Sequence, residues 1–315
     1  MRERHNFDRR TNVLKSDEAK KKYYLVYEGE KTEEIYFDEI ISSREKIGIN
    51  PLIELVRVLR SYSEKNWSNP KKILDRVLKN LRESKTKEIS YETLLNWIME
   101  YLEDEKILTS GRKQAESVWD TLIWICKEKL HVDLENTTDD IEETCKKIAA
   151  YLGEFTNIEN IIDDVPKIIK NRAITYEENF DKICFIIDRD RHSFVSHQEN
   201  NQYKYVLDKC SEYNFGFFIS NPCFEFWLLL HFDEVMQLDE NKLLENPKET
   251  SKRRYTEHNL RKLLPGYSKS SYNVKSLMEK IDTAIANEKR FCEDDHGLEH
   301  CLGSKIGLLI EELRQ

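Results

Sequence analysis

The sequence has 315 residues, of which 35% are charged and 39% hydrophobic, and its net charge is −9. This length allows one or two domains whose hydrophobic core is large enough to need no disulfide or metal for stability. The negative charge argues against a protein that simply coats DNA. No apolar run approaches the roughly 18 residues that span a bilayer, and no apolar segment follows the charged first residues. We therefore expect a globular protein of the cytoplasm, without a membrane span or signal peptide.

The seven cysteines are odd in number and contain no C-x-x-C pair. Neither a disulfide framework nor a zinc ribbon is expected from them. Cys292, His296, His300 and Cys301 lie close together in the chain, but their spacing matches no standard zinc pattern.

Charge is distributed unevenly along the chain. From Lys252 to Lys275, seven basic residues accompany a single acid, Glu257, whereas Asp133 to Asp164 is strongly acidic. A basic strip can attract a phosphate backbone even on an acidic protein, although a solvated helix face explains the same charges.

The first predicted element is a buried strand at 23–27, which ends at Glu28 and Gly29. Thr32 is expected to be the N-cap of the helix that follows it. A second strand is expected at 51–59. Over 61–170 apolar residues recur at helical spacing, which predicts a large all-α insertion.

Strands are expected to return after residue 171, with the remainder of the chain forming helices and loops. Because each predicted strand leads into polar residues, these residues should converge at the carboxyl edge of a parallel sheet. The expected fold is α/β, a mostly parallel, Rossmann-like sheet flanked by helices, formed by residues 1–60 and 171–315. Its later elements are strands at 183–187 and 215–219 and helices at 198–213 and 224–232.

Three carboxylates occupy the expected strand ends. Glu28 follows the first strand, and Asp188 and Asp190 follow the strand at 183–187. Oxygen ligands without cysteine or histidine suit Mg²⁺ or Mn²⁺, and such an ion can activate water beside a phosphate. These acids could instead cap helices or pair with neighbouring basic residues.

Further residues could assist at the same edge. Lys31, Arg189, Arg191 and Asn221 are candidates for contacts with a nucleic-acid substrate. Two polar residues lie in the apolar segment after Asn221, where burial is costly unless they are paired or used. They are Glu225, a candidate fourth metal ligand, and His231, expected to be a hydrogen-bonded core histidine.

Three motifs together resemble the RloB-like (AbiLii-type) protein family. The third is the most specific of them. They are Tyr27-Glu28-Gly29-Glu30-Lys31-Thr32-Glu33-Glu34-Ile35-Tyr36-Phe37, then Ile187-Asp188-Arg189-Asp190, then Ser220-Asn221-Pro222-Cys223-Phe224-Glu225-Phe226-Trp227-Leu228-Leu229-Leu230-His231-Phe232.

The resemblance implies a Toprim-like core in which Glu28 acts as acid/base and metal ligand and Asp188 and Asp190 hold the ion. It also implies a nuclease effector of antiviral defence (abortive infection), acting on RNA or DNA beside an ABC- or AAA-type ATPase; whether tRNA is the target stays open. An oligomer is compatible with it. The turn that the family often shows before its last helix reads His300 to Lys305 here, which leaves that turn's role in doubt.

Two other functions stay open from the sequence. The chain could be a non-catalytic partner of an ATPase that docks through its acidic helical segment. It could also be a metal-dependent phosphotransfer or nucleotide-processing enzyme that uses the same carboxylates.

Overall fold

The computed structural model describes residues 20–29, 31–58, 70–86, 88–104, 112–153, 176–189, 196–197, 200–251 and 253–315. Their contacts divide them into two compact units. The first unit comprises the described residues within 20–58, 70–71 and 177–315, and the second comprises those within 72–176.

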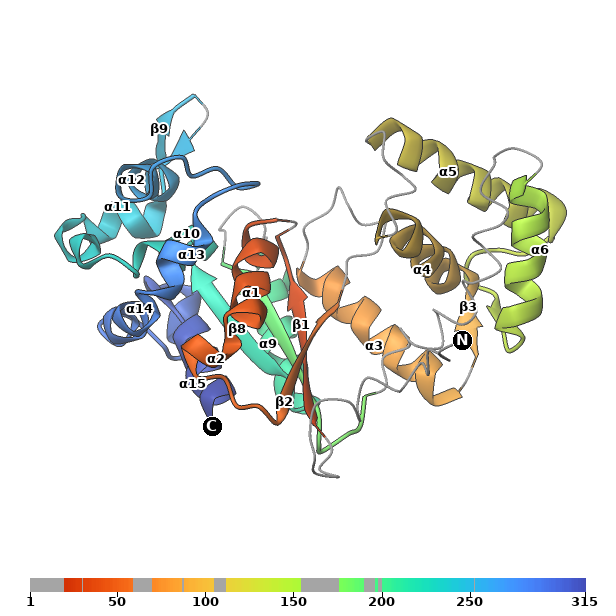
Figure 1. The fold of residues 1–315 in the computed structure, drawn as a ribbon, viewed down its shortest axis with the longest axis horizontal. Helices are drawn as coiled ribbons and strands as arrows, with labels where there is room; N and C mark the ends of the chain where they lie inside the picture. The colour runs from red at the N-terminus through yellow and green to blue at the C-terminus, as the bar shows by residue number, and fades with distance from the viewer. Residues whose placement is uncertain are drawn as a thin grey trace, which may run out of the picture. The chain divides into compact units, whose positions relative to one another are not determined.

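The first unit is built around a five-stranded sheet in the order β11-β8-β5-β1-β2 (Figure 1). Neighbouring strands are parallel, except that the edge strand β11 runs antiparallel to β8. The predicted α/β class with a mostly parallel sheet is therefore confirmed. The strands are β1 (Lys21–Tyr27), β2 (Ile53–Val58), β5 (Lys182–Asp188), β8 (Gly216–Asn221) and β11 (Gly303–Ser304).

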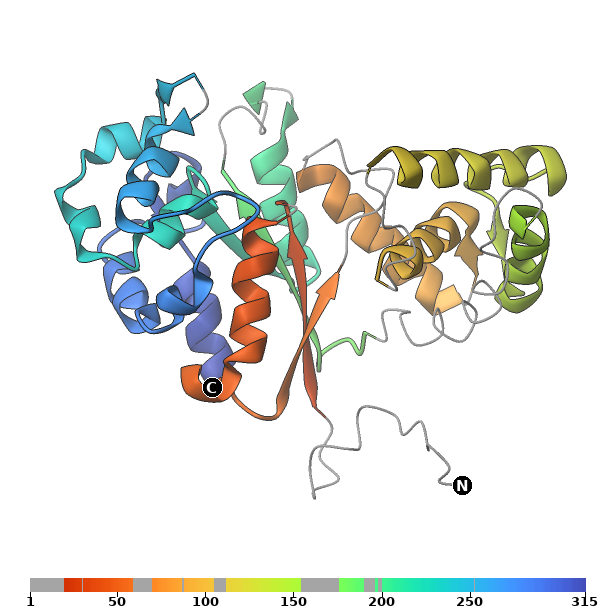
Figure 2. The ribbon, with the colours of Figure 1, turned by 45° about the horizontal axis from the view of Figure 1, so that its top comes forward.

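The central strands are apolar on both faces. In β1, Tyr23, Leu25 and Tyr27 belong to the main core, while Tyr24 and Val26, on the opposite face, are also buried. Successive side chains of a strand point to opposite faces, so such a continuous apolar run needs cover on both sides. Figure 2 shows β1 and β2 side by side, with α1 in front of the sheet.

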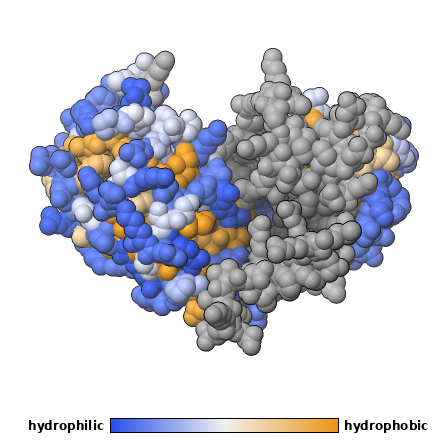
Figure 3. All heavy atoms as spheres, viewed as in Figure 1, coloured by the Kyte–Doolittle hydropathy of each residue, from blue (hydrophilic) through white to orange (hydrophobic). Residues whose placement is uncertain are grey.

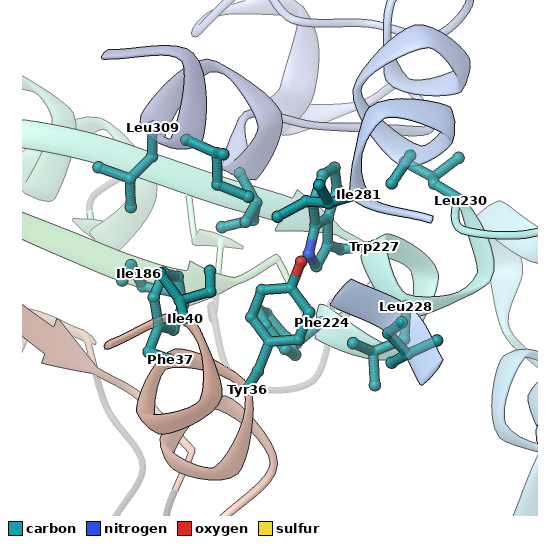
Figure 4. Close-up of a cluster of buried hydrophobic side chains, with 14 of the residues drawn as sticks. Tyr36, Phe37, Ile40, Ile186, Phe224, Trp227, Leu228, Leu230, Ile281 and Leu309 are labelled. Atoms are coloured by element: carbon teal, nitrogen blue, oxygen red, sulfur yellow. The ribbon is translucent and has the colours of Figure 1, made fainter. Parts of the chain in front are cut away.

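Helices α1 and α9 provide cover on opposite faces. Tyr36 and Phe37 of α1 join the core that contains Phe218, whereas Tyr203 of α9 packs edge-to-face on Phe217, at 5.6 Å between ring centroids. In Figure 4 the aromatic rings of Tyr36, Phe37, Phe224 and Trp227 gather in this core. Helices α10 and α15 also contribute to it.

The remaining elements of the first unit are short helices and hairpins, most of them after β8. They are α1 (Thr32–Ser42), α2 (Arg44–Ile47), β6 (Ser196–His197), β7 (Asn200–Asn201), α9 (Gln202–Glu212), α10 (Phe224–Leu229), η3 (Asp233–Gln237), α11 (Glu240–Glu245), β9 (Lys248–Thr250), β10 (Arg253–Arg254), α12 (Tyr255–Leu263), α13 (Val274–Met278), α14 (Ile281–Glu288), η4 (Gly297–Glu299) and α15 (Ile306–Arg314).

Among its described residues, the second unit is helical apart from one pairing of two-residue strands, β3 with β4. The prediction of an all-α segment is corrected to this extent, because two residues carry no recognisable periodicity. Leu94, Leu95, Ile98, Trp119 and Leu122 belong to its own apolar core. Its elements are α3 (Pro70–Thr86), β3 (Ile89–Ser90), α4 (Tyr91–Asp104), α5 (Arg112–Trp124), η2 (Ile125–Lys129), β4 (Thr137–Thr138) and α6 (Ile141–Gly153).

Two further details differ from the sequence predictions. Helix α1 begins at Thr32, so Lys31 rather than Thr32 is the N-cap residue, and no side chain caps the helix. Strands β9, β10 and β11 lie in a region predicted to hold only helices and loops.

The exposed side chains are mostly polar. The face of the first unit seen in Figure 3 is largely hydrophilic, with apolar atoms in small separate areas. In the part of the chain that the structure describes, no helix combines the length and apolar character needed to cross a membrane.

Candidate functional site

Glu28 is fixed at the carboxyl edge of the sheet. Its backbone N–H donates to the carbonyl of Ile186 at 3.0 Å, which continues the pairing of β1 with β5 by one residue. Its carboxylate oxygen Oε2 accepts the N–H of Asp188 at 3.0 Å. Glu28 is 5% exposed, so this carboxylate is held against the end of the neighbouring strand.

Asp188 is the last residue of β5. Its Oδ1 accepts the N–H of Phe224, the first residue of α10, at 2.8 Å. A carboxylate in this position satisfies a backbone donor that the first turn of a helix leaves open. The helix-capping role considered from the sequence therefore describes one contact of Asp188, and this contact ties β5 to the start of α10.

Glu33 is a third carboxylate at this edge, and the sequence predictions treated it only as part of a helix. It lies in the first turn of α1, where it is buried, and its Oε1 accepts the N–H of Gly29 at 3.0 Å. A Cβ at Gly29 would lie 1.9 Å from the other oxygen of Glu33. Glycine at this position thus allows the Glu33 carboxylate to fold back over the turn after β1.

Glu225 and Lys269 form an ion pair across the site. Nζ of Lys269 lies 3.1 Å from Oε1 of Glu225, and the Tyr267 hydroxyl donates to the same oxygen at 3.2 Å. The Glu225 side chain is 4% exposed and the Lys269 side chain 68% exposed. Burial alone would raise the pKa of Glu225, but the adjacent ammonium of Lys269, together with hydrogen bonds from Cys223, from Lys269 and from the backbone, holds this pKa below the usual value.

The loop that carries Lys269 is anchored to the start of α1. Thr32 Oγ1 donates to the carbonyl of Lys269 at 3.1 Å, and the Tyr272 hydroxyl donates to the carbonyl of Thr32 at 2.7 Å. These bonds join residues more than two hundred positions apart in the chain, and they hold the ammonium over the carboxylates.

We call Glu28, Glu33, Asp188 and Glu225 the carboxylate cluster. Burial raises the pKa of Asp188 well above its usual value, and the charges of the other three members raise it further. Burial also raises the pKa of Glu33, to about 6, with Glu225 adding to the effect. Such shifts arise where like charges share a site that holds too little positive charge, and they are common at functional sites.

The cluster has the donor chemistry that a hard divalent cation requires. Carboxylate oxygens are the preferred protein ligands of Mg²⁺ and Mn²⁺. Among the described residues, however, no group of three or more His, Cys, Asp or Glu side chains is arranged to hold a metal ion. Asp190, a predicted ligand, lies outside the described residues. The carboxylate oxygens therefore suit a divalent cation chemically. If Glu225 bound that cation, it would have to give up its ion pair with Lys269.

The predicted substrate-binding residues lie in different surroundings. Lys31 is exposed beside α1. Arg189 is 5% exposed, and its guanidinium lies 5.4 Å from the centroid of the Tyr203 ring. The backbone N–H of Arg189 donates to the Ser220 carbonyl. Asn221 is fully buried and donates through Nδ2 to the Leu298 carbonyl at 2.8 Å. Arg191 lies outside the described residues.

The structural role predicted for His231 is confirmed. This residue is fully buried, with Nδ1 3.2 Å from the Trp227 carbonyl and Nε2 3.1 Å from the Tyr36 hydroxyl. A neutral ring that donates from Nδ1 and accepts at Nε2 satisfies both contacts. His231 therefore braces α10 against α1 beneath the site.

A family model described as RloB-like protein matches residues 23–313. The chain belongs to the RloB-like protein family. The match includes the whole carboxylate cluster and Lys269, and it confirms the resemblance carried by the three sequence motifs. Neither the curated proteins nor the solved structures include a significant match to the chain.

Proposed function

We propose that this RloB-like protein is a metal-dependent nuclease with a Toprim-like centre, which cleaves phosphodiester bonds in RNA or DNA. The observation that carries the proposal is the gathering of four carboxylates at the carboxyl edge of a parallel sheet, where ligands of open α/β sheets bind. Glu28, Glu33 and Glu225 are buried, and Asp188 is partly buried. Their mutual repulsion favours a bound cation.

In this proposal Mg²⁺ or Mn²⁺ binds to Glu28 and Asp188, with Glu225 and Asp190 as further ligands. The ion would supply an activated water and neutralise charge that develops on the phosphate. Glu33 contributes negative charge that favours the ion and shares the turn after β1 with Glu28.

Lys269 is the basic residue best placed to contact a substrate phosphate. Its ammonium reaches the cluster, and its side chain is 68% exposed. When a cation takes over Glu225, the same ammonium becomes available for a phosphate oxygen a short distance away. The exposed Lys31 is a second candidate for this contact.

A second function is favoured by a different observation. Glu28 and Asp188 each accept a backbone N–H, as carboxylates with a purely structural role would. The chain would then be a non-catalytic partner of an ABC- or AAA-type ATPase in antiviral defence. In the nuclease proposal the same type of ATPase is the controlling partner.

Cleavage assays distinguish the two functions. The wild-type chain, Glu28→Gln and Asp188→Asn are incubated with tRNA, single-stranded RNA, single-stranded DNA and plasmid, with Mg²⁺ or Mn²⁺, with and without the ATPase. Both substitutions retain an oxygen acceptor for the backbone N–H. We expect cleavage by the wild type and loss of cleavage in both folded variants. Equal cleavage by all three proteins, or none with the ATPase present, contradicts the nuclease.

A further inference from the structure

The segment between α14 and β11 folds back so that Cys292 and Cys301 become neighbours. The Cys292 N–H donates to the carbonyl of Leu302 at 3.0 Å, and Cys292 pairs with Gly303 in an isolated parallel bridge. The approach is close, because a Cβ at Gly303 would lie 1.9 Å from the Cys292 carbonyl oxygen. Two cysteines nine positions apart are thereby held at the two ends of one small loop.

The two thiols differ from the other cysteines in exposure. Cys292 is partly buried and Cys301 is exposed, whereas Cys126, Cys145, Cys184, Cys210 and Cys223 are buried. Burial raises the pKa of Cys292, and an interaction with the Cys301 thiol is among the further causes. Cys292 therefore lies beside the segment that carries Cys301, and Cys301 is open to a dissolved reagent.

Two histidines, His296 and His300, lie between the cysteines in the chain. His300 Nε2 lies 3.8 Å from Glu299. Among the described residues, no group of three or more His, Cys, Asp or Glu side chains is arranged to hold a metal ion. Two thiols close together in the fold, one of them exposed, are suited to reversible oxidation.

We propose that Cys292 and Cys301 are a redox-active thiol pair that hydrogen peroxide converts into an intrachain disulfide. The Cys301 thiolate attacks the peroxide, its sulfur is oxidised to a sulfenic acid, and hydroxide leaves. The Cys292 thiolate then attacks that sulfur, the S–S bond forms and a second hydroxide leaves. With the two thiol protons, each peroxide consumed yields two waters.

The loop closed by this bond supports the end of β8. The Leu298 carbonyl accepts a hydrogen bond from the buried Asn221 amide at 2.8 Å. The Asp295 carbonyl accepts one from the Tyr203 hydroxyl, and the Asp295 carboxylate accepts one from Lys305. Asn221 lies four positions before Glu225 of the carboxylate cluster. A disulfide would restrain this support, a property independent of the nuclease proposal.

Peptide mapping tests the pair directly. The folded, reduced chain is treated with hydrogen peroxide, the excess is removed with catalase, remaining thiols are alkylated, and the digest is analysed by mass spectrometry. We expect one linked peptide that joins Cys292 to Cys301, an intact mass lower by two hydrogen atoms, and reversal by dithiothreitol. The melting temperature of the oxidised chain should also rise, because the bond closes a loop.

Two variants and one control complete the test. Cys292→Ser and Cys301→Ser should each abolish the linked peptide, while Cys210→Ser, at a buried thiol, should leave it unchanged. The proposal is overturned if wild-type Cys301 proceeds to sulfinic acid or links a second chain while Cys292 remains alkylated. Because this outcome is read on the wild-type chain, it holds even if a variant fails to fold.

Discussion

Lys269 places its ammonium 3.1 Å from the carboxylate of Glu225, and the two side chains are 68% and 4% exposed. Because Lys269 reaches Glu225 from the surface, a second cation could approach the same carboxylate and replace the ammonium. The pair therefore compensates part of the charge of the cluster and marks where another cation can take its place.

Replacing Lys269 by methionine tests this compensation. In Lys269→Met the buried Glu225 loses its ammonium, and we expect unfolding free energy to fall by about 1 kcal/mol, a value discounted for the exposure of the lysine. Because Lys269 lowers the pKa of Glu225, this stabilisation is present above the ordinary value of 4.5 and fades as pH falls through the lowered pKa. Urea unfolding at pH 7 without divalent ions measures it.

The matched control is Lys262→Met. Lys262 is exposed on α12, where it donates to Asn259 at 3.2 Å. If both methionine variants lose the same free energy at pH 7, Lys269 does not stabilise Glu225.

Because His231 is buried in the neutral form, we expect the unfolding free energy to fall in weak acid. Burial lowers its pKa from 6.5 to about 3, so the folded chain keeps the ring neutral while the unfolded chain protonates it. Between these values, unfolding free energy should fall by up to about 1.4 kcal/mol per pH unit as pH decreases. His231→Gln should weaken this dependence in urea unfolding at pH 7 and pH 5. The exposed His300→Gln is the control, and an equal pH dependence in both variants refutes the assignment.

At Glu288 we expect the opposite trend, between pH 4.5 and about pH 8. This residue is 1% exposed, its Oε2 accepts the Gly307 N–H at the start of α15, and burial raises its pKa from 4.5 to about 8. Because the folded state retains a proton that the unfolded state releases, stability should decrease as pH rises through this interval.

Replacing the carboxyl group by an amide removes this dependence. Glu288→Gln keeps an acceptor for Gly307, so we expect it to equal the wild type at pH 4.5 and to exceed it in thermal unfolding at pH 8. Glu234→Gln, at an exposed position, should show no such gain. Identical melting temperatures for wild type and Glu288→Gln at pH 8 would contradict the buried, protonated carboxyl group.

The strands that form the centre of the sheet were predictable because each is a continuous apolar run followed by polar residues. This pattern located β1, β5 and β8 and brought Glu28, Asp188 and Glu225 to one edge. Strand β11 was missed, since its two residues are defined by pairing with β8 and not by their own sequence.

Glu33 and Lys269 could not be assigned to the site from sequence reasoning. Glu33 looks like any acid in the first turn of a helix, and its contact with Gly29 depends on how the chain turns after β1. Lys269 belongs to a basic strip that a solvated helix face would also explain. Its position depends on the hydrogen bond from Thr32, which no local pattern reveals.

Calorimetry with Mn²⁺ tests whether the carboxylate cluster binds a divalent cation. Calorimetric titration with Mn²⁺ compares the wild type with Asp188→Asn and with Asp181→Asn. Asp181 lies at the opposite end of β5 and also accepts backbone N–H groups, from Lys22 and Glu177. We expect Mn²⁺ binding by the wild type and Asp181→Asn, and at least tenfold weaker binding by Asp188→Asn, a loss of about 1.4 kcal/mol. Equal affinity in all three proteins, or no binding by the folded wild type, would contradict a metal site at the carboxylate cluster.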